Sequence, residues 1–332
     1  MAADTMSHRE RIKAAIAGGE TDRVPVSLWR HFPERDQTAS DLANSTLEWQ
    51  RRFDFDLVKF MPPGDYPTID WGAASEYRGS PGGTRTTTRY PVTSPDDWAT
   101  LRPLDVHAGF NGKVLDAVRQ TRAGLGPDVP LLQTVFSPLT IAMKLSHGQA
   151  IEHLRAHPEA LREGLEVIAG VTRDMAAASL AAGADGLFFA SQCADFRLLD
   201  ETEYREFGVT YDLRVLRDLS GDAIVMLHLH GEAPMFDLAA SYPAQIVNWH
   251  DRHAAPDLAT GQRESGRCVA GGINERAIAT MTAGEAAAQA HDAIAQTGGR
   301  SLIVAPGCVI PVATPEANVR AVVDAARAVL PS

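Results

Sequence analysis

Short runs of aliphatic and β-branched residues alternate along the whole chain with longer segments of helical periodicity. Eight of these runs are predicted as strands: Val24–Leu28, Leu57–Phe60, Val129–Val135, Gly186–Ala190, Ala223–His230, Ile246–His250, Cys268–Ile273 and Leu302–Ala305. Strands that alternate with helices pair in parallel and are buried on both faces. Eight such units predict an α/β fold, a (β/α)8 TIM barrel that forms a single domain over residues 1–332. A doubly wound open sheet is the alternative, but its Gly-x-Gly-x-x-Gly pattern is absent after the first strand.

Helix signals fill most of the segments between these strands. Ala150–Gly183 has apolar residues at helical spacing, and we expect two helices there, split near His157-Pro158, because the residue before a proline disfavours helical geometry. Three further helices are predicted with their end signals: Thr202–Leu219 with Asp200 as N-cap, Met281–Gln296 with Thr282 as cap and a stop at Gly298-Gly299, and Pro315–Leu330 with Thr314 as cap.

The stretch from Met61 to Asp128 is too long for a simple helical crossover. It is rich in proline and glycine, and Arg85–Tyr90 has the composition of a strand. These features predict a β-hairpin followed by a helix from about Gly109. Long insertions on barrels usually follow a strand and help to form the site, so we expect residues 61–128 to cover the barrel mouth.

Bulk composition excludes several classes of function. The chain has 332 residues and a formal net charge of −11, without a Lys/Arg-rich run, which argues against a nucleic-acid partner. Its three cysteines, Cys193, Cys268 and Cys308, are too sparse for a disulfide framework and favour a reducing compartment. The first residues lack the apolar core of a secretory signal, and no apolar run reaches the roughly 20 residues that span a membrane. We therefore expect a soluble, cytoplasmic protein with a small-molecule substrate.

Metal-ligating side chains gather at the predicted carboxyl ends of the strands, where barrel enzymes hold their active sites. His228 and His230 are the sharpest pair, because residues two apart on a strand point to the same face. Leu227 and Leu229 alternate with them and would point toward the helices. Two imidazoles and the Cys308 thiolate are a reasonable ligand set for Zn²⁺. The alternative is that one histidine is a hydrogen-bonded inward residue and the other a general acid or substrate anchor.

Other strand ends supply candidate substrate-binding groups. They are Arg30 and His31 after the first strand, Lys59 at the end of the second, Gln192 and Cys193 after the fourth, and His250 after the sixth. The cationic groups would bind a substrate carboxylate, or Arg30 would form a salt bridge to a neighbouring loop. Cys193 competes with Cys308 as a metal ligand because its strand neighbours that of His228. His250 would hold substrate or a hydrogen bond to His230, or would cap its strand.

The order and spacing of several motifs resemble the uroporphyrinogen decarboxylase superfamily over nearly the whole chain. These motifs are Arg9-Glu10-Arg11 through Val26, Phe136–Thr140, Ala182–Gly186, His228-Leu229-His230-Gly231, Pro306–Pro311 and Thr314–Asn318. One branch of this superfamily consists of decarboxylases that use no cofactor and bind a tetrapyrrole. Of their two arginines after the first strand, only the first has a match here, Arg30, and Asp65 is the loose counterpart of their aspartate.

The second branch, the corrinoid-dependent methyltransferases similar to methylcobalamin:coenzyme M methyltransferase, is the closer resemblance. Its members bind zinc through a His-x-Cys motif after the fifth strand and a cysteine in a Pro-Gly-Cys turn after the eighth. His228 and Cys308 match two of these ligands, and His230 replaces the first cysteine, which makes a metal site one unit more positive.

The resemblance implies a metal-dependent methyltransferase that holds Zn²⁺ or another divalent metal at His228, His230 and Cys308. It further implies a corrinoid on a partner protein as the methyl donor, a small anionic acceptor, and a homodimer. Two alternatives stay open. One is a cofactor-free carboxy-lyase that acts on a tetrapyrrole or another polycarboxylate, and the other is a non-catalytic corrinoid or tetrapyrrole binding protein.

Overall fold

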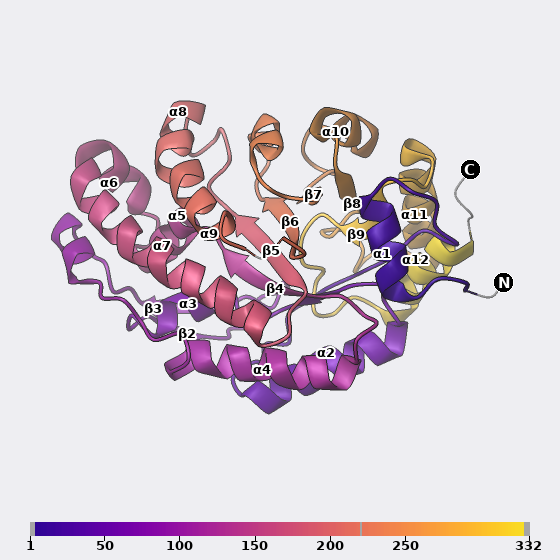
Figure 1. Cartoon of the computed structure of the whole chain (residues 1–332), viewed down its shortest axis with the longest axis horizontal. Helices are drawn as coiled ribbons and strands as arrows, with labels where there is room; N and C mark the ends of the chain where they lie inside the picture. The colour runs from indigo at the N-terminus through magenta and orange to yellow at the C-terminus, as the bar shows by residue number, and fades with distance from the viewer. Residues whose placement is uncertain (1–3, 220, 329–332) are drawn as a thin grey trace.

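A computed structural model describes residues 4–219 and 221–328 of the chain. Its centre is a curled sheet of seven parallel strands (Figure 1). In spatial order they are β1 (Val58–Phe60), β4 (Leu131–Phe136), β5 (Gly186–Ser191), β6 (Ile224–Leu229), β7 (Ile246–Trp249), β8 (Cys268–Ile273) and β9 (Leu302–Pro306). Every residue of these strands is buried, which is the pattern of parallel strands covered on both faces. Seven of the eight predicted strands are therefore confirmed.

The predicted strand Val24–Leu28 is wrong as a regular strand. The segment forms only an isolated parallel bridge between Val26 and Val304 of β9. It is nevertheless hydrogen-bonded to β9 at one edge of the sheet and to the residues just before β1 at the other, because Ser27 N donates to Val304 O (3.0 Å) and Asp56 N donates to Val26 O (2.9 Å). Pro25 has no amide hydrogen, so the segment cannot form an uninterrupted ladder. This short extended segment joins the β9 edge to the chain just before β1.

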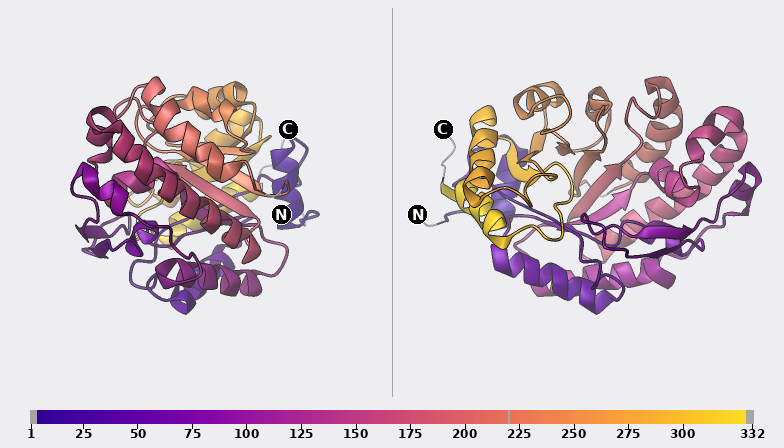
Figure 2. Two further views of the ribbon diagram at one scale, coloured as in Figure 1. Left: turned by 60° about the vertical axis from the view of Figure 1, so that its left-hand side comes forward. Right: turned by 180° about the vertical axis from the view of Figure 1, so that it is seen from behind.

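Twelve α-helices of the described chain surround the sheet (Figure 1), and Figure 2 shows the same arrangement from two further sides. They are α1 (His8–Ile16), α2 (Ala39–Phe53), α3 (Tyr66–Ile69), α4 (Gly109–Leu125), α5 (Pro138–Leu145), α6 (Ala150–Ala156), α7 (Pro158–Ala181), α8 (Glu201–Tyr204), α9 (Thr210–Leu216), α10 (Leu258–Ser265), α11 (Ala283–Thr297) and α12 (Glu316–Ala328). Within the described residues, no helix combines the length and the apolar character needed to cross a membrane.

Several predicted helix ends are confirmed. The break between α6 and α7 falls at His157, directly before Pro158. Asp200 caps α8 by accepting a hydrogen bond from Glu203 N (2.8 Å), and Thr282 caps α11 by accepting one from Glu285 N (3.2 Å). These side-chain oxygens satisfy amide groups that have no partner inside the first turn of the helix.

Two helix predictions are wrong in part. The helix expected over Thr202–Leu219 runs without a break from Glu201 to Leu216, but its segment Arg205–Val209, between α8 and α9, is π-helical. Thr314 is not a cap: its hydroxyl donates to Pro311 O (2.7 Å), and α12 begins two residues later, at Glu316. The predicted end of that helix, Leu330, lies outside the described residues.

The region after β1 contains a second, small sheet. Its strands β2 (Ala74–Glu76) and β3 (Thr86–Arg89) are antiparallel, and the helix predicted from about Gly109 begins at that residue as α4. A 3₁₀ helix at Pro95–Thr100 lies between β3 and α4, and another at Phe236–Ser241 follows β6.

Candidate metal centre

Four metal-ligating side chains meet at the carboxyl ends of the strands. They are His228 on β6, His230 directly after it, His250 directly after β7, and Cys308 in the turn after β9. One potential ligand atom from each lies within 4.8 Å of all the others. His230 Nδ1 is 3.0 Å from His250 Nε2 and 3.9 Å from Cys308 Sγ. The structure thus brings together the three residues predicted as metal ligands and adds His250 to them.

Strand register explains why His250 joins the cluster. β6 and β7 are neighbours in the sheet, and His228 pairs with Asn248. Continuing this register by two residues places His230 opposite His250. The side chains of a parallel pair in register lie on the same face, so the ring centroids of these two histidines are only 4.6 Å apart.

Two glycines allow the ligand-bearing segments to approach so closely. Gly231, directly after His230, has φ +129°, and a Cβ there would overlap the Asp195 carboxylate. Gly307 packs its Cα against β7, where a Cβ would lie 2.8 Å from Trp249 O and 2.9 Å from Glu275 Oε2. Contacts this short exclude a side chain, so glycine at position 307 lets the turn that carries Cys308 close over the cluster.

A buried asparagine fixes which nitrogen of His228 faces the cluster. Asn248 Nδ2 donates to the backbone oxygens of Ala270 (2.7 Å) and Pro306 (3.1 Å), which settles the orientation of its amide. Its Oδ1 must therefore accept from His228 Nδ1 at 2.6 Å. With the proton on Nδ1, the Nε2 lone pair of His228 is available to a cation.

Glu275 does the same for His250. Its Oε1 lies 2.6 Å from His250 Nδ1, and both residues are buried. The carboxylate accepts the Nδ1 proton, so the Nε2 lone pair of His250 faces His230 Nδ1, 3.0 Å away. Sequence reasoning missed both supporting residues. The available signal was position: Asn248 precedes His250 by two residues on its strand, and Glu275 follows the predicted strand Cys268–Ile273 by two.

Electrostatics favour neutral imidazoles in the cluster. Burial, reinforced by the neighbouring histidines, lowers the pKa of His228 well below its usual value and that of His230 to about 4. Burial raises the pKa of the Cys308 thiol, whereas the nearby Lys59 lowers it. The lowered pKa values keep His228 and His230 neutral, and with His250 and Cys308 the cluster offers three imidazoles and one sulfur. This donor set fits Zn²⁺, which binds imidazole and thiolate ligands in tetrahedral sites.

Apart from His250, which lies in the cluster, the predicted substrate-binding residues fall into three places. Gln192 and Cys193 line a cavity of about 450 Å³ that also reaches His230. Burial raises the pKa of Cys193 to about 12, so its sulfur stays a thiol. Lys59 is buried, with Nζ 4.0 Å from the ring centroid of Phe188, and burial lowers its pKa to about 7.

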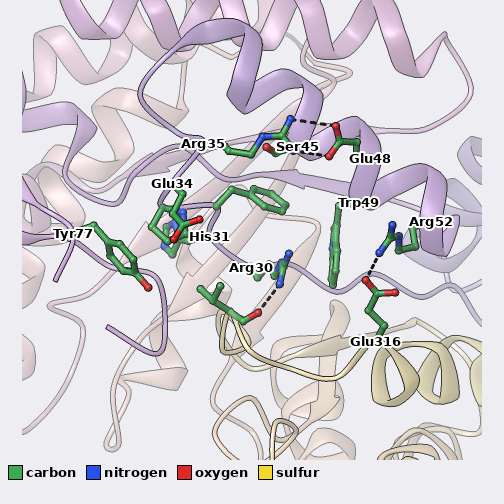
Figure 3. Close-up of a pocket in the computed structure, with 13 residues that line it drawn as sticks. Arg30, His31, Glu34, Arg35, Ser45, Glu48, Trp49, Arg52, Tyr77 and Glu316 are labelled. Atoms are coloured by element: carbon green, nitrogen blue, oxygen red, sulfur yellow. Dashed lines mark hydrogen bonds and ion pairs between the residues drawn. The ribbon is translucent and has the colours of Figure 1, made fainter. Parts of the chain in front are cut away.

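Arg30 and His31 line a different cavity, of about 270 Å³ (Figure 3). The Arg30 guanidinium lies 4.6 Å from the Trp49 ring centroid and donates to Val312 O. His31 is buried, which lowers its pKa to about 3. The structure does not bring these two residues into the cavity next to the cluster, and their predicted role in binding substrate stays a prediction.

The His/Cys cluster and the cavity next to it lie at the carboxyl ends of parallel strands. This is the arrangement of a barrel-type protein with a candidate metal site. The chain belongs to the uroporphyrinogen decarboxylase (URO-D) family, whose model matches residues 7–329. This confirms the resemblance drawn from the sequence motifs.

Relatives from both branches of the superfamily match the chain. A uroporphyrinogen decarboxylase from Alkalilimnicola ehrlichii is 29% identical over 238 residues, which are 64% of this chain and 64% of that protein. A methylcobamide:CoM methyltransferase from Methanosarcina acetivorans is 20% identical over 244 residues, 72% of this chain and 70% of its own length. The match to the decarboxylase thus spans less than two thirds of that relative. Among solved structures, a methyltransferase from Methanosarcina mazei superimposes with a TM-score of 0.84 at 21% identity, covering 96% of this chain and 98% of that one, and shows that the fold is shared.

Proposed function

We propose that this protein is a metal-dependent methyltransferase that transfers a methyl group between a corrinoid and the sulfur of a small acceptor. The observation that carries the proposal is the cluster of His228, His230, His250 and Cys308, with its ligand atoms within 4.8 Å of one another. The methyltransferase relative from Methanosarcina acetivorans supports the reaction class. Zn²⁺ is the metal that the donor set favours, and another divalent metal is the alternative.

The residues of the cluster have distinct roles in this proposal. His228 and His250 present Nε2, because Asn248 and Glu275 hold their Nδ1 protons. Cys308 contributes the sulfur ligand from the turn after β9. When bound, the metal would supply Lewis acidity that favours the thiolate form of the acceptor at neutral pH. His230 lies both in the cluster and on the wall of the 450 Å³ cavity, so the acceptor would reach the cluster past this residue.

The reaction balances without a further reactant. The acceptor thiolate supplies the electron pair of the new S–CH₃ bond, the thiol proton leaves to solvent, and the electron pair of the broken Co–CH₃ bond stays on the cobalt of the corrinoid. A corrinoid carried by a partner protein would dock at the carboxyl ends of the strands.

We further propose that residues 24–28 complete a closed eight-stranded barrel as one domain, that the segment 61–128 forms part of its mouth, and that the protein is a homodimer.

Metal content tests the proposal. Elemental analysis of the purified protein is expected to find about one zinc per chain, with a strong loss in His230→Ala. His291→Ala, at an exposed histidine on α11, is the matched control and should keep its metal. Carefully prepared wild-type protein without stoichiometric metal, or equal metal content in the two variants, would refute the proposed function.

A second candidate is a cofactor-free carboxy-lyase, which the uroporphyrinogen decarboxylase relative favours. Incubation with uroporphyrinogen followed by product analysis separates the two reactions. Loss of carboxyl groups from the tetrapyrrole by protein stripped of metal would favour the lyase and count against the methyltransferase.

A further inference from the structure

The cavity beside the cluster has a chemical character of its own. His230 lines it on the side of the cluster, and Asp65, Tyr90, Lys144, His147 and Gln192 are among the other residues that line it. At about 450 Å³ it has the size of a site for a small molecule. The polar residues on its walls can therefore indicate which small molecule the cluster acts on.

Lys144 contributes a cation that contacts an aromatic ring and is not part of an ion pair among the described residues. Its side chain on α5 lies with Nζ 4.8 Å from the ring centroid of Phe136 and forms no hydrogen bond or ion pair with any residue the structure describes. The other cation of the cavity, Arg85, is paired with Asp36: its Nη2 donates to Asp36 Oδ1 and Pro33 O, each at 3.0 Å, whereas its Nε has no partner among the described residues. One positive charge thus remains for a ligand, and burial raises the cost of leaving it unpaired.

Asp65 contributes a carboxylate that is only half satisfied. Asp65 is only 9% exposed. Its Oδ2 accepts a hydrogen bond from Ser75, whereas its Oδ1 has no partner among the described residues. Asp65 and Lys144 attract each other across the cavity, but their charged atoms are not close enough for an ion pair. The same small cavity therefore holds one unpaired cation and one carboxylate that needs another donor.

This pair of opposite charges fits a zwitterion. A ligand with one carboxylate and one ammonium group would satisfy both residues at once and bring no net charge into the cavity. A polycarboxylate would face Asp65 with repulsion and would find a single free cation. The cluster adds a third requirement, a sulfur atom in the ligand. A soft thiolate such as Cys308 selects metals that also bind sulfur from a substrate.

Resting on the proposed function, we propose that the acceptor is a small α-amino acid that carries a thiol. Lys144 binds its carboxylate, Asp65 binds its ammonium group, and its sulfur points past His230 toward the cluster. The amino-acid end is then recognised by residues that follow β1 and β4, and the reacting end lies at β6, β7 and the turn after β9.

Three thiols of similar length test this inference by calorimetric titration of the purified protein. L-Homocysteine has both charged groups, 4-mercaptobutyrate lacks the ammonium group, and 3-aminopropane-1-thiol lacks the carboxylate. We expect L-homocysteine to bind at least tenfold more tightly than either analogue, the free-energy equivalent of about 1.4 kcal/mol. Equal affinities for the three thiols would overturn the inference.

Two conservative variants assign the contacts. Asp65→Asn should abolish the preference over 4-mercaptobutyrate, and Lys144→Met should abolish the preference over 3-aminopropane-1-thiol. Asp324→Asn and Lys113→Met remove the same charges from exposed positions on α12 and α4 and should keep both preferences. Circular dichroism checks that each variant is folded. Preferences that survive in folded Asp65→Asn and Lys144→Met would refute the assignment.

L-Methionine separates this inference from the proposed reaction. It has both charged groups but no thiol, so its binding to metal-free protein requires neither metal nor methyl transfer. If L-methionine binds with the same dependence on Asp65 and Lys144 while methylcobalamin gives no methylated thiol, recognition of the amino acid is supported and the methyltransferase is refuted. If 2-mercaptoethanesulfonate is methylated as efficiently as L-homocysteine, the methyltransferase is supported and the amino-acid substrate is refuted.

Discussion

Asn248 should control metal affinity although it contacts no metal itself. In Asn248→Leu a side chain of similar size replaces the amide, and three hydrogen bonds are lost: the one to His228 Nδ1 and those to the backbone oxygens of Ala270 and Pro306. Without its acceptor, the His228 ring is free to rotate or to move its proton to Nε2. Loss of such a supporting hydrogen bond typically costs 10–100-fold in metal affinity, about 1.4–2.7 kcal/mol.

The matched control is Asn318→Leu. Asn318 on α12 is equally buried, and its Nδ2 also donates to two backbone oxygens, those of Ile278 and Met281, at 2.8 Å each. Both variants remove the donor to two carbonyl groups, which should cost roughly 1–3 kcal/mol of stability in each, and Asn248→Leu additionally loses the bond from His228 Nδ1. Competition for zinc with a chromophoric chelator should detect weaker binding only in Asn248→Leu. Equal zinc affinity in the two variants would show that the orientation of His228 does not depend on Asn248.

Three further predictions concern stability and the approach of the cysteine turn. Asp56→Asn should lower the free energy of unfolding by about 3–5 kcal/mol, because it removes the buried carboxylate that Arg11 and Arg23 share and leaves them with Asp22 and Asp4 alone. Asp54→Asn, at a carboxylate that is 55% exposed, should cost less than about 1 kcal/mol in the same urea titration. His8 has its pKa raised from 6.5 to about 9 by hydrogen bonds to both carboxylates, so its contribution is complete below pH 6.5 and is lost as the pH rises through about 9. The stability difference between wild type and His8→Gln should therefore shrink over that range, and a constant difference would contradict the assignment. Gly307→Ala should weaken zinc binding about tenfold, because its Cβ would lie 2.8 Å from a backbone oxygen of β7 and displace the turn, whereas Gly284→Ala, with open space around it, should not.

Periodicity was sufficient to predict the pair at the centre of the site. His228 and His230 face the same way because they are two residues apart on a strand, and this depends only on local geometry. The place of Cys308 came from the family resemblance instead. His250 needed the register between β6 and β7, which one sequence does not specify, because strand pairing is a property of the folded sheet.

Lys144 shows a different limit of sequence reasoning. A search of the strand ends reaches Phe136 and Ser137 but stops short of Lys144, which is carried to the cavity by the second turn of α5. Arg30 shows the converse, since its position after the first predicted strand suggested the reaction site, whereas the ring of Trp49 holds it at another cavity. Side-chain direction in loops depends on tertiary packing, which residue spacing alone does not determine.

The four cluster residues all lie between positions 228 and 308, whereas the cavity walls opposite them come from residues 64–193. This separation has an evolutionary consequence. Substitutions within residues 64–193 can change which substrate binds. The cluster, its supporting residues Asn248 and Glu275, and the glycines Gly231 and Gly307 can be inherited unchanged. Descendants of one ancestor could thus diversify in what they recognise and keep the same reactive centre, as expected when function resides in sites placed on a common fold.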